Sequence, residues 1–591
     1  MTSSVSGRFW VERCSEQQDA AALAMVQQHG LAAVLAKILS GRGIQLENVE
    51  SFLEPRLRDL MPDPFVLQDM EKAVRRLADA VESGQTVAIF GDYDVDGACS
   101  AALLAEFLRQ CGVPYLIHIP DRLTEGYGPN SEAIRKLHAQ GANLLVMVDC
   151  GTAGHAPIAE ATLLGLDVVV LDHHQAPEEL PQALALVNPN RQDDLSGLGY
   201  LCAAGVVFLT LVALNRELRH RPFAGSHQMP DLMASLDLVA LATVADVVPL
   251  KGLNRAFVRQ GLIVMRARNR AGLAALADAA GLKDEPEAWH LGYLIGPRIN
   301  AGGRIGDSGL GAKLLLTQEP EDAARLAGEL DFLNRERQQI EQVAVEEATA
   351  FAEQRLEAAS PDDFLLAYSP EWHAGVVGLV AARLKERFRR PVFAFTSSDE
   401  GMATGSGRSV PGYDIGAAVH AAVDAGLAVK GGGHAMAAGA TVPADKLEEF
   451  RVFLSDYFRE RGIDDGQPDK LEIDALLTAG GATPELVKLF RKAGPFGSEQ
   501  PEPVFAFASH RLLEAREVGS GGHVRIKLRA GDGSTIGGIA FRAAGQPLGI
   551  ALLKSVGTVI HAAGTLSLDL WGGKEKVDLR LMDMAVPETS A

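Results

Sequence analysis

Three short apolar segments of the sequence each end in acidic or histidine side chains. TVAIF (86–90) leads into the acidic turn Gly91-Asp92-Tyr93-Asp94-Val95-Asp96-Gly97, LLVMV leads to Asp149, and DVVVL leads to Asp172-His173-His174. Carboxylates with imidazole and without cysteine form a hard ligand set suited to Mg²⁺ or Mn²⁺, and histidine favours Mn²⁺. Two such ions about 3.5–4 Å apart can share a carboxylate, activate water and stabilise the leaving oxygen of an in-line displacement.

Two other interpretations of these segments compete with a metal site. Aspartate after a strand is a common turn or helix-cap residue, and any one segment alone fits that structural role better. DYDVDG also partly fits a calcium-binding loop, but an apolar helix begins at Ala98 and the twelfth loop position is Leu103 rather than glutamate. Three acidic strand ends that converge repel one another unless cations lie between them, so together they favour a metal site.

The elements that must bring these side chains together alternate between strands and helices. Strands are predicted at 86–90, 115–119, 144–149 and 167–172, with helices at 98–110, 131–141 and 157–166 between them. Apolar strands that alternate with helices indicate a parallel sheet covered on both faces. Because ligands bind beyond the carboxyl ends of such strands, we expect the acidic residues to meet at one edge of the sheet.

The rest of the chain predicts an α/β fold class with several domains. We expect an N-terminal helical extension, a first α/β domain, a connecting helix, a second α/β domain and a β-rich domain of OB type, at residues 1–80, 81–318, 319–357, 358–465 and 466–591. The connecting helix would be roughly 55 Å long at 1.5 Å per residue.

Composition limits the classes of protein that the chain can represent. A net charge of −20 argues against non-specific coating of duplex DNA, although it leaves room for a local basic groove. Five cysteines without a CxxC pair argue against a disulfide framework or a structural zinc site. We find no apolar run of about 20 residues and no export signal, so we expect a cytoplasmic protein without membrane contacts.

These motifs resemble the DHH phosphoesterase superfamily, in which Asp246 of ATVADVVPL matches a fourth motif. The resemblance narrows to the RecJ single-strand-specific exonucleases through four further segments. They are GPRINAGGRIGD (296–307), WHAGVVGLVAARL (372–384), GSGRSVPGYDI (405–415) and KGGGHAMAAG (430–439).

The resemblance implies a role for each acidic or histidine residue around two Mn²⁺ or Mg²⁺ ions. Asp94 and Asp96 would bind the first ion with Asp92 beside them, and Asp149 would bridge the two ions. His173 and Asp246 would complete the second site. His174 would lie near the scissile phosphate, and Asp172 would orient the histidines.

Basic and glycine-rich segments predict the substrate contacts. Arg298, Asn300 and Arg304 lie in an apparent glycine-rich loop and can hold phosphate or form surface salt bridges. The glycine runs at 405–409 and 431–434 can approach a phosphate closely or form ordinary turns. The resemblance implies further contacts from His373, Arg408, Ser409, Gly432, Gly433 and His434. Trp372 fits core packing equally well.

The function that the resemblance implies is a 5′-to-3′ exonuclease specific for single-stranded DNA, releasing 5′-mononucleotides in DNA repair and recombination. Its partners would be single strands with a free 5′ end, a single-strand-binding protein and a helicase, and the enzyme would act as a monomer. Three alternatives stay open: a DHH phosphodiesterase of oligoribonucleotides or small nucleotides, a pyrophosphatase-like enzyme, and a non-catalytic DNA-binding scaffold.

Overall fold

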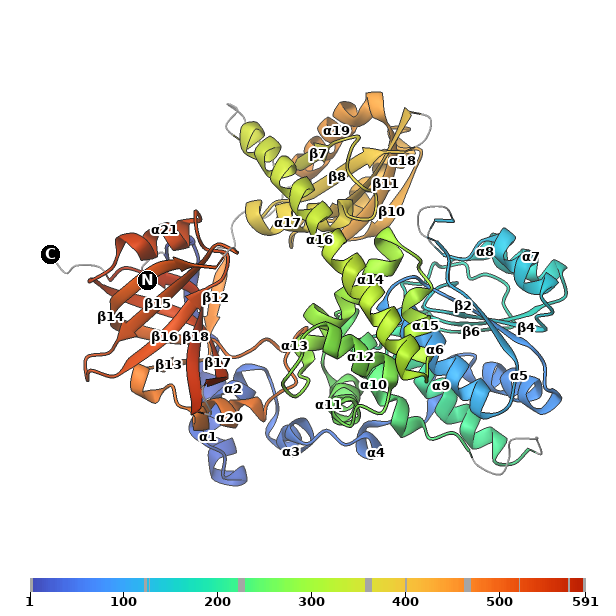
Figure 1. Cartoon of the computed structure of the whole chain (residues 1–591), viewed down its shortest axis with the longest axis horizontal. Coiled ribbons are helices and arrows are strands. Elements are labelled where there is room, and N and C mark those ends of the chain that lie inside the picture. The colour runs from blue at the N-terminus through green and yellow to red at the C-terminus, as the bar shows by residue number, and fades with distance from the viewer. Residues whose placement is uncertain are drawn as a thin grey trace. The chain divides into compact units, whose positions relative to one another are not determined.

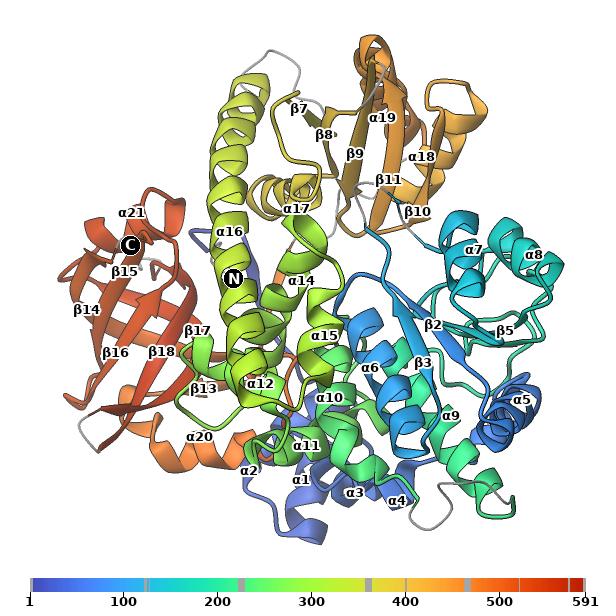
Figure 2. The same cartoon turned by 45° about the vertical axis from the view of Figure 1, so that its right-hand side comes forward.

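The computed structural model describes residues 4–121, 125–126, 128–221, 229–356, 364–398, 401–461, 469–519, 521–571 and 574–587. The chain forms two compact units (Figures 1 and 2). The barrel unit comprises Met1–Met61, Pro249–Arg259 and Gly466–Ala591, and the α/β unit comprises Pro62–Val248 and Gln260–Asp465. Among the described residues, no helix has both the length and the apolar character that crossing a bilayer requires.

The first sheet of the α/β unit is parallel throughout, as the alternation of strands and helices predicts. Its strand order is β3-β2-β4-β5-β6. The strands are β2 (Val87–Gly91), β3 (Tyr115–His118), β4 (Leu144–Val148), β5 (Asp167–Leu171) and β6 (Ala185–Val187). The sequence prediction omits only β6. Since all five strands point the same way, their carboxyl ends share one edge of the sheet.

Helices cover both faces of this sheet (Figure 2). One face packs on α7 (Ser131–Ala139) and α8 (His155–Leu163), where alternate strand residues such as Phe90 and Met147 meet Ile134 in one apolar cluster. The other face packs on α5 (Met70–Ser83), α6 (Val95–Gln110) and α9 (Ala203–Leu218). Burial on both faces explains why the strands are apolar throughout rather than alternating.

The segment after α9 is helical and contains the main departure from the sequence prediction. The helices are α10 (Leu236–Ala245), α11 (Gly252–Arg266), α12 (Ala271–Ala279), the π-helical turn η4 (Leu291–Ile295), α14 (Gly296–Ile305), α15 (Leu310–Leu316) and α16 (Pro320–Leu356). The glycine-rich loop predicted around Arg298 and Arg304 is wrong, because these residues lie on α14. The long connecting helix is confirmed as α16, which has 37 residues.

The second sheet of the α/β unit has the order β10-β11-β9-β8-β7. Its elements are β7 (Leu365–Tyr368), α17 (Val377–Phe388), β8 (Val392–Ser397), β9 (Met402–Arg408), α18 (Ile415–Asp424), β10 (Lys430–His434), β11 (Ala437–Pro443) and α19 (Leu447–Glu460). The two glycine runs lie mainly on strands β9 and β10 rather than in turns. On β9 the glycines leave room for the buried rings of Phe393 and Phe395.

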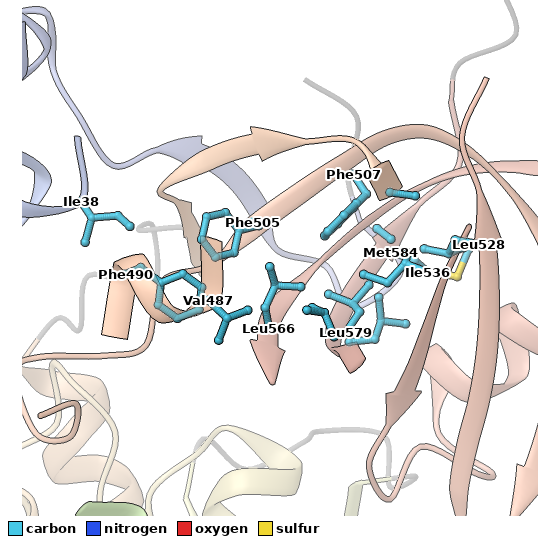
Figure 3. Close-up of a cluster of buried hydrophobic side chains, with 14 of the residues drawn as sticks. Ile38, Val487, Phe490, Phe505, Phe507, Leu528, Ile536, Leu566, Leu579 and Met584 are labelled. Carbon is cyan, nitrogen blue, oxygen red and sulfur yellow. The ribbon is translucent and has the colours of Figure 1, made fainter. Parts of the chain in front are cut away.

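The barrel unit contains a six-stranded sheet in which five strands close into a barrel, which confirms the β-rich C-terminal part. The strand order is β13-β14-β15-β16-β18-β17, and β14 also pairs with β17. The strands are β13 (Ala475–Leu477), β14 (Phe505–Val518), β15 (His523–Arg529), β16 (Thr535–Ala540), β17 (Val559–Trp571) and β18 (Lys574–Ala585). Phe505, Phe507 and Leu579 lie in its apolar core (Figure 3).

The N-terminal segment packs with this barrel and is not purely helical as predicted. Strand β1 (Phe9–Glu12) pairs in parallel with β12 (Lys470–Ile473), and Ile38 of α2 (Ala33–Gly41) joins the barrel core (Figure 3). Arg255 of α11 belongs to the same unit and donates hydrogen bonds to the carbonyls of Phe52, Ala493, Gly494 and Pro495. These partners are hundreds of residues away, which local sequence patterns do not reveal.

Candidate metal centre

The acidic residues follow the carboxyl ends of three neighbouring strands of the first sheet. Asp92 comes directly after β2, Asp149 after β4 and Asp172 after β5. A fourth acid, Asp246, follows the last residue of α10. The shared edge of parallel strands therefore brings together residues that are far apart in the sequence.

The turn between β2 and α6 is folded tightly around its carboxylates. Asp94 caps α6 by accepting a hydrogen bond from the Gly97 N–H at 3.1 Å. A Cβ atom at Gly97 would lie 2.3 Å from the carbonyl oxygen of Asp92, so only glycine fits there. The carboxylate of Asp96 accepts the backbone N–H groups of Ala203 and Ala204, at 2.6 and 2.8 Å, at the start of α9. The N-terminus of a helix thus orients an anionic side chain.

Three groups of potential ligands overlap at this edge. They are Asp92 with Asp94 and Asp149, Asp96 with His173 and Asp246, and Asp149 with His173 and His174, and in each group the ligand atoms lie within 4.8 Å of one another. The Nε2 atom of His173 is 3.3 Å from Asp149, 3.6 Å from Asp246 and 3.7 Å from Asp96. Asp149 belongs to two groups, as a bridging carboxylate must.

Two carboxylate oxygens of this edge lack the hydrogen bonds that buried anions require. Asp92 Oδ1 and Asp149 Oδ1 are buried and have no hydrogen-bond donor among the described residues. Burial and the neighbouring acids raise the pKa of Asp92 to about 8 and that of Asp246 to about 9. The same causes raise the pKa of Asp96 and Asp149. Divalent cations would bind these oxygens and neutralise the neighbouring carboxylates. The residues at this edge therefore fit a pair of divalent cations.

Asp172 is used in a different way from the other acids. It accepts hydrogen bonds from the backbone N–H groups of Thr152 (3.0 Å), His173 (2.7 Å) and His174 (3.2 Å), and from His174 Nδ1 at 2.7 Å. Although burial opposes ionisation, these bonds hold the pKa of Asp172 well below its usual range. Burial also opposes the charge of His174, but the Asp172 carboxylate raises the pKa of His174 to about 9.

Two asparagines that the sequence interpretation missed also hold the histidine segment. Asn188 donates to the His174 carbonyl at 2.8 Å, and Asn190 donates to the His173 carbonyl at 2.5 Å. Both residues follow β6 at the same edge as the acids. Prediction of β6 as a fifth strand would have pointed to them.

The three predicted phosphate-binding residues of α14 each contact other parts of the protein. Arg298 forms an ion pair with Asp331 of α16 at 3.0 Å. Asn300 Oδ1 accepts the Val95 N–H at 3.1 Å. Arg304 donates to the carbonyl of Gly375 at 3.1 Å, in the loop before α17.

Residues near the second sheet that were predicted to contact the substrate also form hydrogen bonds within the protein. Ser409 is fully buried and donates to the Tyr413 carbonyl at 2.6 Å. Trp372 is a core residue, and its indole donates to Glu347 at 2.8 Å. His373 Nδ1 accepts the Gly375 N–H at 3.0 Å, and His434 Nδ1 accepts the Met436 N–H at 3.3 Å. Arg408 donates to the Gly407 carbonyl at 2.8 Å, and Gly432 and Gly433 lie on β10 between Gly431 and His434.

Comparison with known protein families matches three parts of the chain. The DHH family N-terminal domain matches residues 86–243, the DHHA1 domain matches 362–460, and the RecJ OB domain matches 473–583. These ranges cover both sheets of the α/β unit and most of the barrel.

Individual relatives match over most of the chain. The single-stranded-DNA-specific exonuclease RecJ of Dickeya dadantii is 39% identical over 530 residues, which are 86% of this chain and 89% of that protein. The protein of the same name from Escherichia coli is 38% identical over 523 residues, with the same coverage of both chains. The crystal structure of RecJ in complex with Mn²⁺ from Thermus thermophilus superposes with a TM-score of 0.79 and 28% identity, covering 98% of this chain and 80% of that one. The chain therefore belongs to the RecJ family of DHH proteins.

Proposed function

We propose that this protein is a metal-dependent exonuclease that degrades single-stranded DNA. The observation that carries the proposal is the group of carboxylates and imidazole at the sheet edge, where two buried carboxylate oxygens lack donors among the described residues. The names of the Dickeya and Escherichia relatives supply the reaction and the substrate. The Thermus structures in complex with Mn²⁺ and with Mg²⁺ support either ion as the cofactor.

Two divalent cations at this edge would supply Lewis acidity for the attack of water on a phosphodiester and would balance the charge that develops on the phosphate. The chain provides the rest by holding its ligands in place. Asp149 lies where it can serve both ions, and helix α9 fixes Asp96. His174 is held by Asp172 in its charged form and suits a contact to a phosphate oxygen, since 42% of its side chain is exposed.

For the substrate contacts we retain only residues whose side chains or backbone suit a phosphate. Arg304, His373, Arg408 and His434 remain proposed contacts to the nucleotide being removed. The backbone of Gly432 and Gly433 is proposed to lie beside them. Arg298 and Ser409 are better explained as structural, because Asp331 and Tyr413 take their donors.

The outer face of the barrel is proposed as an extension of the DNA track. Arg525, Lys527 and Arg529 point outward from β15, between buried Val524, Ile526 and Leu528. In register with them on β14 lie Arg516 opposite Arg525 and Arg511 opposite Arg529, while Glu514 lies opposite Lys527 and pairs with Arg516 at 2.7 Å. Like charges placed directly opposite destabilise a sheet, whereas a polyanion laid across them removes that cost.

The polarity and the biological setting rest on the family resemblance alone. We propose that the enzyme starts at a free 5′ end, releases 5′-mononucleotides and acts as a monomer in DNA repair and recombination. A single-strand-binding protein and a helicase would expose its substrate.

A digestion of end-labelled DNA tests this proposal. Identical sequences are prepared as single strands and as duplexes, labelled at the 5′ or the 3′ end, and incubated with Mn²⁺, Mg²⁺ or a chelator. We expect 5′-labelled single strands to release labelled mononucleotide first, only with metal, and a parallel Asp149→Asn preparation to be inactive. Equal digestion of duplex, or release from the 3′ end first, would contradict the proposal.

The same assay separates the alternatives that the sequence left open. An enzyme of small nucleotides would hydrolyse a dinucleotide faster than a long strand. A non-catalytic scaffold would bind the strand and release no product with either metal. The RecJ names of the relatives and the presence of every predicted ligand at the edge favour neither alternative.

A further inference from the structure

One face of α14 lies against the acidic turn between β2 and α6. Gly296, Asn300 and Gly303 are spaced by four and three residues, so they share one side of the helix. A Cβ atom at Gly303 would lie 2.7 Å from the carbonyl oxygen of Tyr93, and one at Gly296 would lie 3.7 Å from Val95 Cγ2. The helix backbone therefore approaches the turn closely at Gly303, whereas at Gly296 a Cβ atom would make only ordinary van der Waals contact with Val95.

Asn300 stands between the two glycines and makes the polar contact of this face. Its Oδ1 accepts the Val95 N–H at 3.1 Å. Val95 is the first residue of α6 and lies between two predicted metal ligands, Asp94 and Asp96. The first N–H groups of a helix have no partner within the helix, so a side chain from elsewhere must satisfy this one.

Two other residues of α14 bind neighbouring elements and hold the helix in place. Arg298 is paired with Asp331 of α16, and Arg304 donates to Gly375 before α17. A Cβ atom at Gly375 would lie 2.1 Å from the carbonyl oxygen of Arg304, so these backbones also touch. The helix that carries Asn300 is thus held from two other elements of the α/β unit.

We propose that Asn300 is a positioning residue for the metal-binding turn and does not bind the DNA phosphate. Without its acceptor the Val95 N–H is left unsatisfied, and the turn relaxes together with the flanking carboxylates of Asp94 and Asp96. The inference depends on the proposed metal centre and not on the identity of the nucleic acid. It therefore concerns metal affinity in the absence of substrate.

The test compares three variants of the full chain by Mn²⁺ titration calorimetry without DNA. Asn300→Ala removes the acceptor, and we expect Mn²⁺ affinity to fall about 10–100-fold, as for other residues that orient metal ligands. Asn300→Asp keeps an oxygen for the Val95 N–H, and we expect Mn²⁺ affinity within about threefold of wild type, because the bond is retained.

The matched control is Asn143→Ala. Asn143 Oδ1 accepts the Thr86 N–H at 3.0 Å, just before β2 and at the opposite end of that strand from the acidic turn. The control removes a bond with the same donor and acceptor types from a more exposed site, so it should leave Mn²⁺ affinity unchanged. A control that loses Mn²⁺ affinity as much as Asn300→Ala would show general destabilisation and overturn the inference.

Steady-state kinetics at saturating Mn²⁺ gives the second readout. We expect the KM for single-stranded DNA to stay near the wild-type value in both Asn300 variants. The proposal is refuted if Asn300→Ala keeps wild-type Mn²⁺ affinity but has a raised KM, and Asn300→Asp has a still higher KM. Those results would make Asn300 a phosphate contact. If the proposed metal centre itself is wrong, the wild-type chain will not bind Mn²⁺. That result differs from every outcome in which only the role of Asn300 is wrong.

Discussion

Asp149 combines a left-handed backbone with a buried carboxylate. Its φ of 60° lies in the left-handed region, which aspartate adopts less readily than glycine. Its carboxylate is 2% exposed, and Oδ1 accepts no hydrogen bond from the described residues. Burial of a carboxylate with too few donors destabilises the folded state, and a cation beside it offsets that cost.

Replacement of Asp149 by asparagine should separate stability from activity. The change removes the buried charge at constant shape, so the metal-free protein should unfold at a higher temperature. Catalysis should fall by at least about 10²–10³-fold, the loss typical of a single preorganised electrostatic group. Differential scanning fluorimetry with a chelator measures the stability of the metal-free protein. The same measurement with Mn²⁺ should show a smaller Mn²⁺-induced rise in Tm than in the wild type. The digestion assay measures the loss of activity. A variant with normal activity would contradict the bridging role.

The pair of Asp172 and His174 predicts a dependence on pH. Since the carboxylate of Asp172 raises the pKa of His174 to about 9, His174 stays charged at neutral pH. In Asp172→Asn the amide oxygen can still accept the backbone N–H groups of His173 and His174, although Thr152 N–H loses its acceptor. The pKa of His174 falls towards its ordinary value. The positive charge is then lost as pH rises above about 7. We expect kcat/KM with Mg²⁺ to fall about 10–100-fold, and the deficit to grow from pH 6 to pH 9. A deficit that is constant over this range would exclude the charge of His174 as the cause.

At the scale of elements, the decisive feature is that α14 is a helix. Gly303 and Asn300 on one face let this helix contact the turn that carries three acids. Glycine lowers helix propensity, so its repeated use in this helix points to packing rather than to local preference. The dense glycines are also why the segment resembles a loop in the sequence.

Gly303→Ala tests the close approach of α14. Alanine raises helix propensity by about 1 kcal/mol, but its Cβ would meet the Tyr93 carbonyl at 2.7 Å. We expect unchanged helix content by circular dichroism and Mn²⁺ affinity lowered about 10–100-fold. Gly328→Ala on α16 is the matched control, because a Cβ there meets nothing within 4 Å. Equal Mn²⁺ affinity in both variants would show that the contact does not position the turn.

At the scale of the whole molecule, a net charge of −20 and a DNA substrate are compatible only if positive charge is concentrated locally. The outward row of Arg525, Lys527 and Arg529 on β15 meets that condition. Arg511 and Arg516 on β14 add positive charge beside this row, which Glu514 partly offsets. The acids of the sheet edge account for another part of the negative charge, which bound cations would neutralise.

Removing the positive charges of Arg525, Lys527 and Arg529 should change how DNA binding depends on salt concentration. In a triple variant with glutamine at 525, 527 and 529, we expect weaker binding of long single strands. The slope of log K against log salt should lessen by about 2, since each lost phosphate contact removes about 0.7. Fluorescence anisotropy over a salt series measures the slope, and hydrolysis of short oligonucleotides should change little. An unaltered slope would place the DNA elsewhere.

Some residues of the site could be placed from the sequence, and others depend on contacts between distant segments. Asp92, Asp149 and His173 could be placed together from sequence, because parallel strands share an edge, whereas Asp246 needed the family resemblance. The roles of Arg298 and Ser409 could not be predicted, since their partners, Asp331 and Tyr413, depend on tertiary packing. Strand β1 was missed because its partner β12 lies more than 450 residues away.

The central claim is that the sheet edge binds two cations that share Asp149. Anomalous diffraction from crystals grown with Mn²⁺ measures this directly. We predict two peaks, one beside Asp92 and Asp94 and one beside His173 and Asp246, with the Asp149 carboxylate between them. Asp96 should contact the second peak, because it lies with His173 and Asp246 and not, as the resemblance implied, with Asp94 at the first ion. A map with one peak, or with peaks away from these side chains, would contradict it.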